Sequence, residues 1–565
     1  MMYRSCFSAL MILFTAASPA LGQGLSDPLP APTDNGFRIG YERVLIAPNT
    51  SGIVDSRDSR TRINFFNEAP DGRHFLNDLR GQLYTIDSTI SPTDNKGTTT
   101  KYLDLNDRFT DLRYDSGLAA GFINFTFHPE FVTNGKFYTI HAERGQDAQS
   151  NGKNPDFIPP TFDQSDITHH TVITEWTANN PAASVFSGSS RELLRVGTVP
   201  RSYFHPFGDA QFNPNARPSD DDYGLLYISG GDHGFINGLG AGGADPSNDT
   251  PLPSQLQRLD TLAGTLIRID PRSASETGGI AGIGDYTIPD INPFANDNDA
   301  NTLGEVFAYG LRNSHRITWD SVDVEQNDGV TGSLYASDIG GAEIEEVNRI
   351  IAGGNYGWVY REGTFVNALD FADNDTSNNS LDDTFIVNVD SDDDDGDNFL
   401  YPVLQYDHDS ANTGFAIAGG IVYQGSIPEL QGKFIFGDIV TGRLFVSELD
   451  DIRNIDLDRD INSLVGDDPL LGSAPFETFE LIDEDGNSKT LRDLVQENLG
   501  SGYSSRIDLR FGVDAEGEIY VLTKSDGALI RLVPEPSSLV LLGSVGAFML
   551  HRRRSRYEML QERQI

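Results

Sequence analysis

The feature that most restricts the fold of this chain is a short unit that recurs along it. Each copy reads as a strand, a turn containing Gly or Asn, and a second strand that carries a tyrosine. The copies occupy segments 79–87, 125–140, 210–229, 317–337 and 509–522. Strand alternation around a glycine-containing turn is typical of a β-hairpin. Hairpins repeated at uneven intervals of several tens of residues indicate antiparallel sheets stacked around an axis.

No linker rich in Pro, Ser or Gly divides the body between about residues 37 and 533. Its length suits six blades with long inserted loops. We therefore predict an all-β fold, a six-bladed β-propeller with long acidic loop insertions, over residues 37–533. A chain of β-sandwich domains is the alternative. One short helix is predicted over Leu491–Leu499, with Thr490 as its cap and Gly500 as its stop.

The charge balance excludes one class of partner. Asp and Glu number 84 against 41 Lys and Arg, which gives a formal net charge of −43. Such a chain repels phosphate backbones, so we exclude nucleic acid as a partner. The acids are densest in loops 370–383 and 390–398. These loops suit calcium, but neither has EF-hand spacing, and a solvated acidic insertion is the other interpretation.

The N-terminal residues 1–22 have the layout of a secretory signal peptide. Arg4 precedes an apolar run from Phe7 to Ala17, and small residues follow up to Gly22. A membrane anchor is the alternative, although the run is short for a bilayer. Cleavage would remove Cys6, the single cysteine, so a disulfide framework, a zinc–thiolate site and a cysteine nucleophile are excluded.

The C-terminal residues 534–556 have three parts. Pro534-Glu535-Pro536 is followed by an apolar stretch from 539 to 550 and by arginines 552–554. This tail resembles the PEP-CTERM sorting signal. The resemblance implies a Gram-negative cell envelope, an exosortase as processing partner, and delivery to the outer surface or the extracellular matrix. A plain C-terminal anchor is the alternative, and in both cases the body is exported.

Polar groups that converge at one end of a propeller's channel usually carry its function. Segment 204–212 contains His205, which is a general base at neutral pH or a structural hydrogen-bonding group. Segment 305–319 contains the adjacent Arg312 and Asn313. That pair suits a planar anionic ligand, or equally a surface ion pair.

A third segment, 334–358, contains the turn Gly340-Gly341, which is either an approach of backbone carbonyls to a cation or an ordinary glycine turn. In this order the three segments resemble the soluble pyrroloquinoline-quinone (PQQ)-dependent glucose/sorbosone, or aldose sugar, dehydrogenases. The similarity runs from about residue 41 to 533. Further matching segments are 121–131, 262–271, 419–423 and 432–444.

The resemblance implies PQQ and a calcium ion on the top face of the propeller. His205 matches the histidine that takes a proton from the sugar C1 hydroxyl while hydride passes to the quinone. The resemblance also assigns quinone and substrate contacts to Arg312 and Asn313, quinone contacts to Arg506 and Arg510, and calcium ligation to the carbonyls of Gly340 and Gly341. Segment 438–441 lacks the lysine that sugar dehydrogenases pair with a quinone carboxylate.

We therefore predict an exported PQQ- and calcium-dependent dehydrogenase that oxidises an aldose sugar at C1 and passes electrons to an external acceptor. A calcium-stabilised surface propeller without catalysis, binding carbohydrate or protein, is the main alternative. A metal-dependent lactonase is a third interpretation, for which we find no converging carboxylates in the sequence.

Overall fold

Antiparallel strands make up most of the structure, which is a computed structural model. It describes residues 25, 27–51, 60–87, 97–114, 120–145, 153–160, 167–198, 205–233, 256–322, 329–341, 343–369, 384–389, 399–500 and 506–535. The predicted signal peptide, the two acidic loops and most of the predicted sorting segment lie outside these residues. The hairpin prediction is confirmed, because each recurring segment forms or completes an antiparallel pair.

Most of the described strands fall into runs of four neighbours joined by hydrogen bonds. In chain order the runs are β2 (Ile63–Glu68), β3 (His74–Asp78), β4 (Gln82–Ile86) and β5 (Thr99–Asp104); β6 (Phe122–Phe127), β7 (Lys136–Arg144), β8 (His169–Ala178) and β9 (Gly188–Thr198); β10 (Phe207–Phe212), β11 (Leu226–Gly230), β12 (Thr265–Ile269) and β15 (Val306–Tyr309); β16 (Ser314–Asp320), β17 (Ser333–Asp338), β18 (Ile344–Ile350) and β22 (Leu404–Asp407); β23 (Ile417–Val422), β24 (Lys433–Asp438), β25 (Leu444–Glu448) and β26 (Glu477–Ile482); and β28 (Leu509–Val513), β29 (Ile519–Thr523), β30 (Ala528–Val533) and β1 (Thr33–Ile46).

Strand β1 joins the two ends of the chain. It pairs antiparallel with β30, so an N-terminal strand completes the C-terminal run. It also pairs parallel with β26, while β2 meets β28 at the bridge between Asn67 and Val513. These pairings link three runs into one continuous sheet.

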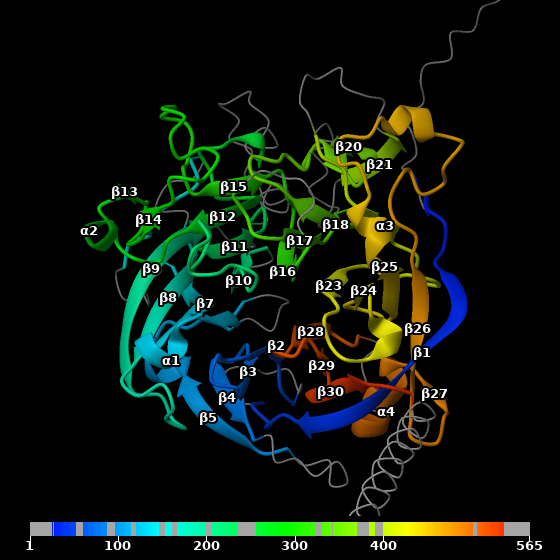
Figure 1. The fold of residues 1–565 in the computed structure, drawn as a ribbon, viewed down its shortest axis with the longest axis horizontal. Coiled ribbons are helices and arrows are strands. Elements are labelled where there is room, and N and C mark those ends of the chain that lie inside the picture. Colours follow the sequence, from blue (N-terminus) through cyan, green and yellow to red (C-terminus); the bar gives the residue numbers. More distant parts are fainter. Residues whose placement is uncertain are drawn as a thin grey trace, which may run out of the picture.

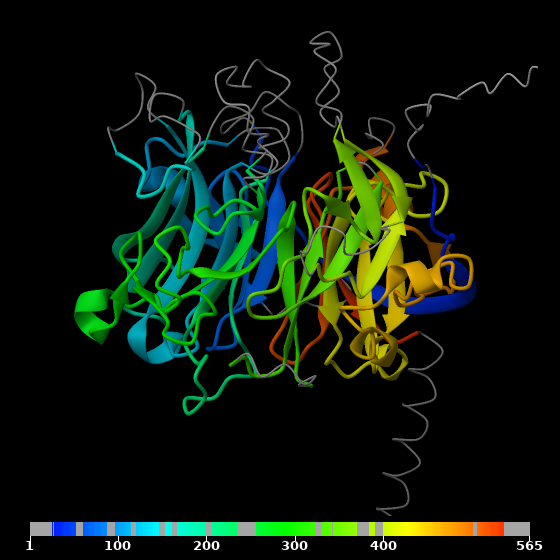
Figure 2. The same ribbon diagram turned by 90° about the horizontal axis from the view of Figure 1, so that it is seen from above.

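The first strands of the runs contact one another in a closed circuit, in the order β2, β6, β10, β16, β23, β28 and back to β2. They lie toward the centre of Figure 1, with β5, β9 and β26 toward the rim. Turned by 90°, the strands run between two faces that carry the loops (Figure 2). Apolar clusters fill the space between neighbouring runs. Trp176 and Phe75 share one cluster, and Tyr227 and Trp319 share another. Burial of these facing surfaces is the main stabilising term of the fold.

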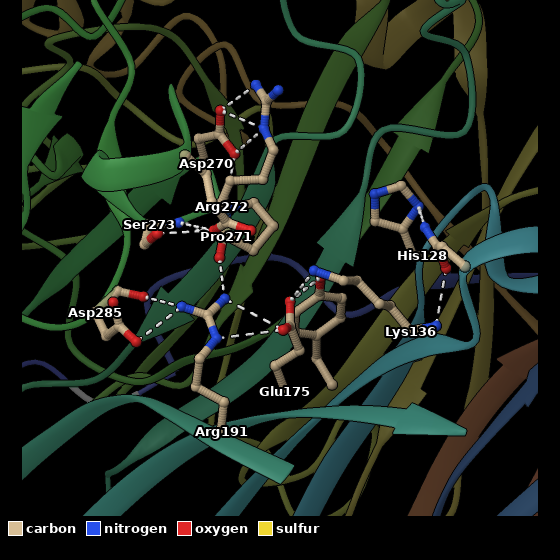
Figure 3. A network of polar contacts seen from close by, with 12 residues as sticks. His128, Lys136, Glu175, Arg191, Asp270, Pro271, Arg272, Ser273 and Asp285 are labelled. Atoms are coloured by element: carbon tan, nitrogen blue, oxygen red, sulfur yellow. Dashed lines mark hydrogen bonds and ion pairs between the residues drawn. The ribbon is translucent and has the colours of Figure 1, made fainter. Parts of the chain in front are cut away.

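Polar contacts also tie neighbouring runs together, as Figure 3 shows. The carboxylate of Glu175 accepts hydrogen bonds from Lys136 Nζ at 3.1 Å and Arg191 Nη2 at 3.2 Å. The same Arg191 donates to the carbonyls of Pro271 and Asp285, at 2.6 and 2.8 Å. The guanidinium therefore links β9 to the segment that follows β12 in the next run.

The remaining described elements are short. Helix α4 (Leu491–Leu499) has Thr490 as N-cap and Gly500 as C-cap, which confirms the predicted helix. None of the helices described has the length and apolar character needed to cross a membrane. The other helices are η1 (Leu105–Asp107), α1 (Phe131–Asn134), α2 (Ala274–Thr277), η6 (Pro428–Leu430), α3 (Leu449–Arg453) and η7 (Ile461–Leu464), and the other strands are β13 (Ile280–Ala281), β14 (Thr287–Ile288), β19 (Arg361–Glu362), β20 (Phe365–Leu369), β21 (Thr384–Val389) and β27 (Ser488–Lys489).

Candidate active site

A cavity of about 270 Å³ lies where the innermost strands begin. Four of the residues singled out in the sequence line it, from three different runs. Because each innermost strand begins at this end of the circuit, residues far apart in the chain meet here. The lining residues are Asn64, Leu79, Ile123, His205, Pro206, Gly208, Asn313, His315, Arg316, Ile339, Phe415, Ala416, Ile439, Val440, Arg506 and Arg510.

His205 lies in this wall just before β10 and is held by a carboxylate. Its Nδ1 is 2.6 Å from Asp232 Oδ1, and the other carboxylate oxygen accepts from Trp358 Nε1 at 3.2 Å. Asp232 follows β11, and its backbone N–H donates to the Arg312 carbonyl at 2.6 Å. A carboxylate on Nδ1 favours the tautomer in which Nε2 carries the lone pair, and that nitrogen could then accept a proton.

Arg312 and Asn313 form a turn whose backbone is held by Asp338. The carboxylate of Asp338 accepts from the Arg312 N–H at 2.9 Å and the Asn313 N–H at 2.5 Å. Asn313 lines the cavity, whereas the Arg312 guanidinium lies over the Trp358 ring, 5.4 Å from its centroid. The two side chains, although adjacent in the chain, therefore point to different places: Asn313 to the cavity and Arg312 to the Trp358 ring.

The Gly340-Gly341 turn lies one residue after the end of β17. A Cβ on Gly340 would approach the Ile344 carbonyl oxygen to 1.7 Å, so the turn requires glycine. The Gly340 carbonyl accepts from Arg312 Nη1 at 2.5 Å, and the Gly341 N–H donates to Glu362 Oε1 at 3.0 Å. As arranged, the Gly340 carbonyl does not fit a calcium ion, because a guanidinium already occupies that oxygen and the two cations would repel.

Arg506 and Arg510 belong to a cluster of cations beside the cavity. Arg510 is buried, its Nη1 donates to the Leu509 carbonyl at 2.6 Å, and its Nε has no hydrogen-bond partner among the described residues. Burial, and then neighbouring Arg316, hold its pKa well below the ordinary value. Burial and Arg510 do the same to the pKa of Lys524.

The carboxylate of Asp508 faces these cations. It pairs with Arg62 Nη1 at 2.8 Å and with Arg506, and although burial opposes the shift, Arg62 and Arg506 hold its pKa well below the ordinary value. Lowered pKa values on Arg510 and Lys524 mean that their positive charge is only partly compensated. An anion in the cavity would supply the missing charge.

Arg316 closes the inner end of the cavity. Its Nη1 donates to the carbonyls of Gly208 and His315, at 2.7 and 2.6 Å, and its Nη2 to that of Asn64 at 3.2 Å. Burial and the Arg316 charge lower the pKa of His315 well below the ordinary value, so this imidazole is neutral. Arg316 and His315 thus form a polar floor.

Sequence reasoning did not assign roles to Asp232, His315, Arg316 or Lys524. The signal for Asp232 was present, because Gly-Gly-Asp ends the hairpin that begins near His205. Lys524 directly follows an apolar strand. Nothing local distinguishes it from a surface lysine, so only the closed circuit of strands identifies it.

Behind the Arg312–Asn313 turn lies a pair of buried carboxyl groups. Asp338 and Glu346 are direct partners across β17 and β18. Burial raises the pKa of Asp338 to about 7, and burial together with Asp338 raises that of Glu346 to about 8. Arg312 opposes the shift of Asp338, and Asp232 and Glu362 add to the negative charge around the pair.

This pair predicts a loss of stability with rising pH. The folded protein holds protons that the unfolded chain releases near pH 4, so the free energy of unfolding should fall between about pH 4 and 8, by up to about 1.4 kcal/mol per pH unit for each retained proton. Glu346→Gln should flatten the pH dependence of the melting temperature and be more stable than wild type above pH 8. Glu480→Gln, on an exposed partly ion-paired carboxylate, is the control. Identical pH profiles for Glu346→Gln and wild type would contradict this reading.

Residues 66–466 match the sequence model of a family described as Glucose / Sorbosone dehydrogenase, whose fold is a β-propeller. Among curated proteins, the chain is 26% identical to HIPL1 protein of Arabidopsis thaliana over 75% of this chain and 54% of that protein. It is 22% identical to Quinoprotein glucose dehydrogenase B of Acinetobacter calcoaceticus, over 42% of this chain and 39% of that protein. The match thus covers about half, or less, of the length of these relatives.

Among solved structures, the PQQ-bound aldose sugar dehydrogenase of Streptomyces coelicolor aligns with a TM-score of 0.46 at 15% identity. The alignment covers 90% of this chain and 100% of that chain.

Proposed function

Because this chain belongs to the glucose/sorbosone dehydrogenase family, we propose that it is a quinone-dependent dehydrogenase that oxidises an aldose sugar at C1. The four-stranded runs around the closed circuit would be the six blades of its propeller. PQQ would lie in the cavity of about 270 Å³, with His205 as the base. The Acinetobacter relative is named as a quinoprotein, which supports a quinone cofactor.

One observation carries the proposal: Arg316, Arg506 and Arg510 line one cavity of a strongly acidic protein. Arg506 and Arg510 line the cavity, and the pKa of Arg510 lies well below its ordinary value because it is buried beside Arg316. PQQ carries several carboxylates, so it is the kind of anion that these groups suit. Lys524 adds positive charge from behind Arg510, in a chain that lacks a lysine at 438–441.

The chain's own residues would then divide the work. Arg506 and Arg510 would bind the cofactor's carboxylates and fix its orientation. Asp232 holds His205 so that Nε2 accepts the proton of the sugar C1 hydroxyl, and the Asp232 carboxylate stabilises the imidazolium that results. When bound, PQQ supplies a two-electron acceptor for the hydride that leaves C1.

The proposal is tested by adding PQQ to the purified protein, with and without calcium, and recording the absorption spectrum. A bound-quinone spectrum that changes on addition of an aldose is the expected result. If no quinone binds at any accessible concentration, the enzyme assignment is wrong.

Calcium binding is part of this proposal and is tested separately. For calcium to bind at Gly340 and Gly341, Arg312 would have to release the Gly340 carbonyl. A chelator should then lower the melting temperature, and the shift should persist after deletion of residues 390–397, which lie in the acidic loops. If a chelator leaves the melting temperature unchanged, calcium does not stabilise this protein.

We further propose that the protein is exported and processed at both ends. The signal-peptide layout of 1–22 and the PEP-CTERM-like segment 534–556 support this. Mass spectrometry of native surface material should find a chain that begins near Gln23 and stops close to Pro536. Retention of arginines 552–554 would contradict processing by an exosortase.

A second candidate function is a surface propeller without catalysis that binds carbohydrate or protein. Two observations favour it: Arg312 occupies the Gly340 carbonyl, and segment 438–441 offers no lysine to a quinone carboxylate. Binding of a glycan in the absence of any quinone binding would support this candidate.

A further inference from the structure

The first and last runs meet at two hairpin tips that carry metal-ligating side chains. Glu68 ends β2, His74 begins β3, and Asp514 directly follows β28. Among the described residues, a ligand atom from each of these three lies within 4.8 Å of the other two. Strands β2, β3 and β28 lie side by side near the centre of Figure 1.

From this cluster we propose a binding site for a divalent transition metal of the zinc type, formed by Glu68, His74 and Asp514. The donor set is one imidazole nitrogen and two carboxylates. Calcium and magnesium take oxygen ligands, whereas an imidazole among carboxylates suits zinc and its first-row neighbours.

Packing positions the ligands before any metal binds. The His74 ring packs against both Phe66 and Tyr520, with centroid distances of 5.2 and 5.6 Å, and those two rings stack on each other. Its Nε2 is 3.2 Å from Glu68 Oε2, and that oxygen also accepts from the Ala515 N–H at 3.0 Å. Asp514 Oδ1 accepts from the Glu518 N–H at 2.8 Å, which holds the carboxylate on its turn. Metal would replace the hydrogen shared between His74 and Glu68.

The site is accessible and electrostatically suited to a cation. Glu68 and Asp514 line a second cavity, of about 450 Å³, at the opposite end of the circuit from the proposed quinone site. Arg316 lines both cavities and separates them. The carboxylates of Glu68 and Asp514 place negative charge where the cation would lie. Three protein ligands leave coordination positions open toward this cavity.

The metal would also stabilise the contact between the first and last runs of strands. Its ligands come from the first and last runs, whose strands β2 and β28 share one β-bridge, between Asn67 and Val513. A metal that binds only the folded chain stabilises it by mass action, so its effect appears in thermal unfolding without any assay of catalysis.

The test uses the full chain, first stripped of metal, with zinc alone as the probe. Zinc should raise the melting temperature, and calorimetry should show a site that His74→Gln weakens by at least about 10–100-fold. Glutamine can still donate to Glu68, so the variant is expected to fold. His128→Gln, which changes a half-buried histidine outside the cluster, should bind zinc like wild type.

Cobalt titration provides a second measurement. Cobalt bound through an imidazole and two carboxylates should give a visible d–d absorption that is lost in both His74→Gln and Asp514→Asn. Equal zinc affinity in wild type and both variants, or stabilisation by calcium but not by zinc, would overturn the site. Neither result depends on whether quinone binds, so this test stands apart from the proposed function.

Discussion

Replacing His205 with asparagine should lower the turnover of an aldose by about 10²–10⁴-fold while leaving the melting temperature nearly unchanged. Asparagine keeps a donor near the position of Nδ1, so the buried Asp232 retains its partner, but it has no basic group in place of Nε2. The measurement is kcat with saturating PQQ and sugar, together with a thermal melt.

Alanine at the same position separates the catalytic from the structural contribution. His205→Ala should lose the same turnover and in addition about 1–3 kcal/mol of stability, because Asp232 is left with one fewer partner in a buried place. His128→Asn is the matched control and should be unchanged in kcat. Full turnover in His205→Asn would show that another group accepts the proton.

Replacing Arg510 with methionine should weaken PQQ binding by about 10–100-fold, which corresponds to the loss of one charge-assisted contact of about 1.5–3 kcal/mol. The same change should leave the quinone-free protein as stable as wild type, or more stable. Burial among other cations penalises the Arg510 charge, and an aliphatic side chain of similar length removes that penalty. Quinone affinity by titration and thermal melts without quinone measure the two effects.

The opposite signs of these two effects are the signature of a binding residue. An arginine needed only for the fold would destabilise the protein when removed and would leave the affinity of the remaining folded protein unchanged. Arg531→Met, on β30 of the same run, removes a cation paired with Glu42 at the surface and should change neither quinone affinity nor stability in the way that Arg510→Met does. If Arg510→Met binds quinone as tightly as wild type, the cation cluster is not the cofactor site.

Much of the local structure could be predicted because its causes lie within a few residues. Helix α4 has its cap, Thr490, and its stop, Gly500, in the sequence immediately around it. The hairpin of β28 and β29 is specified by strand alternation on either side of a glycine turn at Gly517. His205 and Asn313 could be proposed for the same site from their segments, and both line the same cavity.

What the sequence by itself determined, then, is the hairpins, the short helix and the segments from which polar side chains could converge. The closed circuit of strands decided the rest. Arg312 and Asn313 are adjacent in the chain, yet only Asn313 lines the cavity, because the Arg312 guanidinium is held by carbonyls that follow β17. Lys524 lies near Arg510, and Asp232 contacts His205, because the fold brings together segments that are apart in the sequence. The shifted pKa values of Asp338 and Glu346 arise from burial between packed sheets, a property that no local pattern of residues carries.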